Sequence, residues 1–133
     1  MRGTALTAGM GAAMNVLIIL GGLMGASGVI LAAASAHVAG QIKLEPAAYL
    51  LLFHASALFG GIALLDRGLV WRPLGGVALA GFVLGVALFA GDLALRGLAG
   101  HRLFPMAAPL GGLILIGSWL AIAVAGVVAL ARG

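Results

Sequence analysis

Ionisable side chains are scarce in this chain, and five of them are of types that could carry chemistry: His37, His54, Asp92, Arg96 and His101. A histidine can carry a proton near neutral pH, or bind a metal ion or a haem iron through its imidazole ring. An aspartate inside an apolar segment is costly to keep there and often belongs to a proton relay or a ligand site. These five residues are the candidate polar cluster of the chain.

Each of these residues also has a structural interpretation. Arg96 follows Asp92 at i+4, so the two side chains lie on one helix face and can pair near the helix end. Arg96 can also extend to the headgroup region of a membrane. His54 lies in the apolar segment 51–56, where a hydrogen bond to a neighbouring helix can satisfy a neutral imidazole. Ion pairing and helix packing therefore stand beside proton transfer and ligand binding.

Spacing gives little support to a haem or a metal site. A haem held by two histidines on neighbouring helices needs both histidines at a similar depth along the helix axes. His54 is instead expected about 12 Å deeper than His37. Metal binding by His37, His54, His101 and Asp92 is geometrically open, but no two of them are three or four residues apart. The chain has no cysteine and no catalytic-triad, phosphate-loop or zinc-protease motif. We predict a protein that is not an enzyme, with no catalytic residue, no metal and no cofactor.

Composition indicates which elements hold these residues. Of the 133 residues, 64% are hydrophobic and 8% are charged, and the mean hydropathy is +1.27. A spanning helix needs about 20 mostly apolar residues, and four stretches reach that length without the alternation of a barrel strand. We predict an all-α integral membrane protein with four antiparallel transmembrane helices in a single bundle. Residues 1–133 form one membrane domain, with helices at about 14–36, 46–65, 73–96 and 105–131 and an N-terminal extension at 1–13.

Antiparallel helices bring the candidate polar cluster into one half of this domain. The breaks between the stretches are short, so successive helices should be neighbours. His37, Asp92, Arg96 and His101 then lie near helix ends on the same side, and His54 lies about two turns deeper from that side. Any chemistry is expected in this half.

Charge argues against a nucleic-acid partner and sets an orientation. The net charge is +4, but the Lys and Arg residues are scattered singly and form no basic stripe. The positive-inside rule places the side with more cations in the cytoplasm. We predict cytoplasmic N and C termini in a bacterial inner membrane, with membrane lipids as partners. The inner side would hold Arg2, Arg67, Arg72 and Arg132, and the outer side Lys43, Arg96 and Arg102.

The segment Ala34-Ser35-Ala36 resembles a signal-peptide cleavage site. The apolar run before it is longer than a usual signal sequence, and Arg2 is the only cation that precedes it. We expect a retained first helix.

The 23 glycines have a use in a membrane, where helices associate through close backbone packing at small residues. Gly21 and Gly25 form one small-xxx-small pair, and Gly81 and Gly85 form another; Gly117 begins a similar pattern on the last helix. These glycines predict packing within the bundle. They could also serve a homo-oligomer or the docking of another membrane subunit.

The last helix carries a recognisable motif. Pro109-Leu110-Gly111-Gly112 is followed by Trp119. A proline early in a helix is well tolerated, and paired glycines let another backbone approach closely. Trp119 lies about 15 Å farther along the axis, which favours packing or an oligomer contact in the middle of the membrane.

This segment resembles the P-x-G-G motif and the downstream Trp of the domain of unknown function 423 family. Ala36-His37, Phe53-His54 and the segment 88–91 match further landmarks of that family in the same order. Asp92 stands where the family often has Ser. The resemblance covers about residues 14–131, and transmembrane protein 256 of eukaryotes looks like a relative. It implies a four-helix integral membrane protein and supplies no established activity.

Three functions are consistent with these observations. The first is an accessory or structural subunit of a larger membrane complex, or a homo-oligomer, which the small residues and the lack of soluble surface favour. The second is a small transporter, channel or proton carrier that uses His54 and Asp92. The third is a lipid- or quinone-binding membrane protein that uses the candidate polar cluster.

Overall fold

The computed structural model of the protein describes residues 2–37 and 44–133, with side chains from residue 9 onward. The described residues form four helices and no strand. The helices are α1 (Arg2–Ser35), α2 (Glu45–Asp66), α3 (Arg72–Ala99) and α4 (Ala107–Arg132). All four are long and apolar enough to cross a membrane, which confirms the predicted all-α membrane architecture.

The starts of α2 and α3 lie within one residue of the predicted starts, because Pro46 and Pro73 each occupy a first-turn position, where the missing N–H is not needed. The first helix begins at Arg2 rather than near residue 14, so residues 2–13 are part of α1. This segment has no proline to end a helix, and its alanines favour one.

The last helix begins at Ala107 rather than at residue 105. Met106, just before it, has a positive φ of 72°, a left-handed conformation that cannot continue a helix. Pro105 therefore lies in the connection, and Pro109 is the proline inside the first turn of α4.

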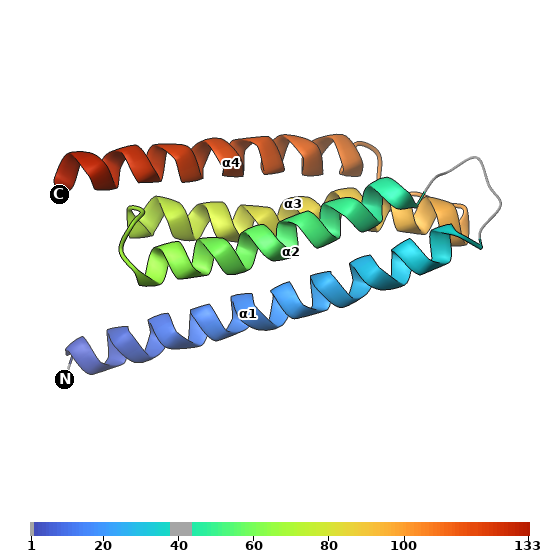
Figure 1. Cartoon of the computed structure of the whole chain (residues 1–133). Helices are drawn as coiled ribbons and strands as arrows, with labels where there is room; N and C mark the ends of the chain where they lie inside the picture. Colours follow the sequence, from blue (N-terminus) through green and yellow to red (C-terminus); the bar gives the residue numbers. More distant parts are fainter. Residues whose placement is uncertain (1, 38–43) are drawn as a thin grey trace.

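Successive helices run in opposite directions, as Figure 1 shows for α1 to α4 from blue to red. The most extensive contacts are between α3 and α4 and between α1 and α2, and α2 joins the two pairs by packing on α3. Within the described parts of the chain, the backbones of α1 and α4 do not approach each other. The helices thus form an open row in chain order, with α1 and α4 at its two edges.

Glycines set the closest helix contacts. On α1, Gly21 faces Phe59 and Leu58 of α2, and Gly25 faces Ala55 less closely. Gly28, which was not predicted, is tighter: a Cβ there would lie 2.8 Å from Leu52. Because glycine has no side chain, α1 and α2 pack closely along the stripe formed by these three glycines.

Glycines also allow the close contact between α3 and α4. Gly81 faces Ser118, and Gly85 faces both Leu115 and the backbone carbonyl of Gly111. Gly117 faces no described neighbour within 4 Å. The predicted α3 pair thus packs inside the chain, whereas Gly117 lies on the free side of α4.

Candidate functional site

His54 is buried in the middle of α2, and both of its ring nitrogens are engaged. Nδ1 lies 2.9 Å from the carbonyl oxygen of Leu50, and the indole Nε1–H of Trp119 donates to Nε2 over 3.2 Å. A carbonyl only accepts and an indole N–H only donates. Nδ1 must therefore carry the hydrogen and Nε2 must accept, which makes His54 a neutral imidazole of one defined tautomer.

Phe82 of α3 completes this arrangement. Its ring centroid lies 5.4 Å from that of His54 and 4.8 Å from that of Trp119, and the rings meet at tilted or edge-on angles. Phe82 is fully buried, while Trp119 is half exposed. We call His54, Phe82 and Trp119 the aromatic trio. It links α2, α3 and α4 although the backbones of α2 and α4 make no close approach in the described chain.

Asp92 is also a buried ionisable side chain and has no exposed surface. Its Oδ2 pairs with Arg96 one turn later on α3. Its Oδ1 accepts a hydrogen bond of 2.9 Å from the backbone N–H of Leu103, in the connection to α4. Asp92 therefore holds this connection against the end of α3. The i+4 spacing of Asp92 and Arg96 predicts their pairing but not this contact with Leu103.

The remaining members of the candidate polar cluster lie at the surface. Arg96 is partly exposed through its side chain, although its Nε is buried and has no hydrogen-bond partner among the described residues. His101 is exposed, and its Nδ1 lies 3.3 Å from the carbonyl oxygen of Arg102. His37 is exposed in the turn after α1.

The five residues thus contribute to separate arrangements. Asp92 and Arg96 are joined, His54 belongs to the aromatic trio, and no hydrogen bond among residues 9–37 and 44–133 connects the two sites. In the same described part, no three His, Asp or Glu side chains are placed to hold a metal ion.

The Pro109 motif brings α4 close to α3 through one of its two glycines. A Cβ at Gly111 would lie 2.6 Å from the carbonyl oxygen of Gly85 and 2.7 Å from the amide nitrogen of Phe89. A Cβ at Gly112 would meet its nearest neighbour, the Phe89 ring, at 3.9 Å, an ordinary contact. Pro109 itself is exposed. Gly111 is therefore the residue that permits the close backbone approach.

Comparison with known proteins identifies a family but no activity. The model of the family described as "Protein of unknown function (DUF423)" matches residues 24–112, more than half of the chain. The match includes His54, Phe82, Asp92 and Gly111, and it ends before Trp119. No curated protein and no solved structure is similar enough to extend this comparison.

Proposed function

The chain belongs to the DUF423 family of proteins of unknown function, and we propose that it acts as a non-enzymatic structural subunit of a membrane assembly. The assembly is either a larger complex in which the chain is an accessory subunit or a homo-oligomer. One observation carries the proposal: the two ionisable side chains that are buried in the described part of the chain, His54 and Asp92, hold its own helices and loop together.

Proton transfer would disrupt these arrangements. A second hydrogen on the His54 ring would occupy Nε2, which could then no longer accept the hydrogen bond from Trp119. A proton on Asp92 would weaken its pairing with Arg96 and leave a charged guanidinium unneutralised. A transporter or proton carrier that uses these two residues is therefore less well supported than a structural subunit.

The exposed face of α4, at one edge of the row of helices, provides a surface for assembly. On α4, Leu113, Gly117, Leu120 and Val124 follow one another at helical spacing and are all exposed. The open position at Gly117 would let a second helix approach this face closely, which is how helices associate in lipid. We further propose that the protein lies in a bacterial inner membrane, and its cation distribution favours an orientation with both termini in the cytoplasm.

The assembly can be tested by gentle detergent extraction from the native membrane followed by native mass spectrometry. We expect a species heavier than one 13.1 kDa chain. Gly117→Leu should reduce that species, because the new side chain would block close approach without a clash inside the chain. Gly60→Leu is the matched control, since Gly60 of α2 is also exposed and open. A lone monomer under every extraction condition would overturn the proposal.

A further inference from the structure

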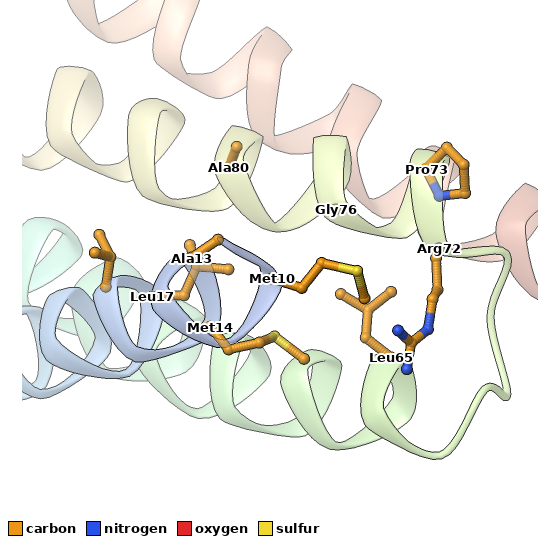
Figure 2. A pocket seen from close by; sticks show the side chains of 10 residues that line it. Met10, Ala13, Met14, Leu17, Leu65, Arg72, Pro73, Gly76 and Ala80 are labelled. Atoms are coloured by element: carbon orange, nitrogen blue, oxygen red, sulfur yellow. The ribbon is translucent and has the colours of Figure 1, made fainter. Parts of the chain in front are cut away.

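An apolar groove lies between the first half of α1 and the first half of α3, and it has a volume of about 650 Å³. That volume is in the range of small-molecule sites in proteins. Met10, Met14 and Leu17 of α1 form one wall, and Gly76 and Ala80 of α3 lie opposite (Figure 2).

The groove exists because α1 and α3 touch only slightly and because the α3 side carries small residues. A Cβ built at Gly76 meets no described atom within 4 Å, so the space in front of it is open among the described residues. The methionines on the α1 wall are flexible and adapt to irregular apolar ligands. The groove thus suits a long, apolar chain of variable shape.

Among the described side chains that line the groove, Arg72 is the one that carries a charge. It is the first residue of α3, and Figure 2 shows its side chain extending toward Leu65 at one end of the groove. Among the described side chains, none forms an ion pair or a hydrogen bond with its guanidinium. Because α3 is long and apolar enough to span a membrane, we expect its first residue at the membrane boundary, at the height of lipid head groups.

We propose that this groove binds an acyl chain of an anionic phospholipid and that Arg72 pairs with the phosphate of its head group. The charge of Arg72 complements that head group, and the apolar lining complements the tail. A quinone fits less well, because its ring carbonyls need hydrogen-bond donors and Arg72 is the only lining side chain that has one. The proposal is independent of the structural-subunit function.

Native mass spectrometry of the purified full-length protein, titrated in detergent with phosphatidylglycerol or phosphatidylcholine, tests the site. A basic side chain near a membrane surface favours anionic lipid enough to give about a fivefold preference. We expect the wild type to retain phosphatidylglycerol about fivefold more tightly than phosphatidylcholine, and Arg72→Gln to bring this ratio close to one. Arg67→Gln is the charge control, because Arg67 is exposed at the same end of the molecule but does not line the groove.

A second pair of variants tests the apolar part of the site. Gly76→Leu should weaken retention of both lipids, because the leucine side chain would enter the open groove. Gly60→Leu, on an open position away from the groove, should leave retention unchanged. Circular dichroism establishes whether each variant is folded. If Gly76→Leu does not fold, the comparison of Arg72→Gln with Arg67→Gln tests the proposed site by itself.

Three results would overturn the proposal. They are equal retention of the two lipids by the wild type, an equal effect of Arg72→Gln and Arg67→Gln, and equal lipid retention by folded Gly76→Leu and Gly60→Leu. A monomeric protein that still shows the lipid preference would contradict the assembly proposal and support this one.

Discussion

The indole N–H of Trp119 on α4 donates a hydrogen bond to Nε2 of His54 on α2 across 3.2 Å. The two residues are far apart in sequence, and the rest of α4 packs on α3 rather than on α2. This bond therefore links the two helices directly, and it requires Nε2 of the buried histidine to accept a hydrogen bond.

Trp119→Phe should destabilise the protein by about 0.6 kcal/mol, the average for hydrogen bonds between membrane helices, and by about 1.7 kcal/mol at most. Phenylalanine keeps an aromatic ring beside Phe82 but leaves Nε2 of His54 without its donor. The midpoint of unfolding in SDS, followed by circular dichroism, measures the loss. A double-mutant cycle with His54→Ala isolates the pair, and strictly additive effects would contradict a direct bond.

Asp92→Ala should loosen the connection between α3 and α4 more than Asp92→Asn does. Asparagine retains an oxygen that can accept from the N–H of Leu103, whereas alanine loses this bond and the pairing with Arg96. The alanine variant should lose about 1–3 kcal/mol. Hydrogen exchange of the segment 100–106 measures the effect. His101→Ala is the control in the same connection, because the exposed His101 makes only one weak contact there.

Two neighbouring glycines on α4 should respond differently to the same change. Gly111→Ala should cost about 1–3 kcal/mol, because the added methyl group would force α3 and α4 apart. Gly112→Ala meets only an ordinary contact, so it should be neutral or stabilising by up to about 1 kcal/mol through better helix propensity. Equal losses in the two variants, again in SDS unfolding, would show that the close approach at Gly111 has no energetic role.

Reconstituted liposomes distinguish a structural subunit from a proton carrier. We expect proton flux no greater than that of protein-free liposomes, measured with an internal pH-sensitive dye, because His54 and Asp92 are held in structural bonds. His54→Ala and Asp92→Asn should give the same trace as the wild type. A flux that the wild type shows and both variants lose would favour the transporter alternative.

The sequence predicts the features of this protein that depend on local spacing. The length of each apolar stretch predicts a spanning helix, Pro46 and Pro73 predict two helix starts, and the i+4 spacing of Asp92 and Arg96 allows their pairing. These properties arise within one helix or at its end.

Contacts between helices are harder to predict. Trp119 reaches His54 because of the axial register of α4 and α2, and Leu103 reaches Asp92 because of the path of the connection. Register and loop path are set by the three-dimensional packing of small residues such as Gly111, and one sequence contains no direct measure of them. The start of α4 differs from the predicted residue 105 for a related reason, since the left-handed backbone at Met106 is unusual for a residue other than glycine.

Because the helices form an open row, the molecule consists of two helical hairpins that each pack mainly within themselves. The most extensive packing occurs within two helical hairpins, α1–α2 and α3–α4, and the chain passes from one to the other through the turn at Gly68. Each hairpin is made of consecutive segments and has its own glycine-lined seam. A chain divided at this turn should therefore give two fragments that insert separately and reassociate through α2 and α3, which makes Gly68 a natural site for split-protein complementation.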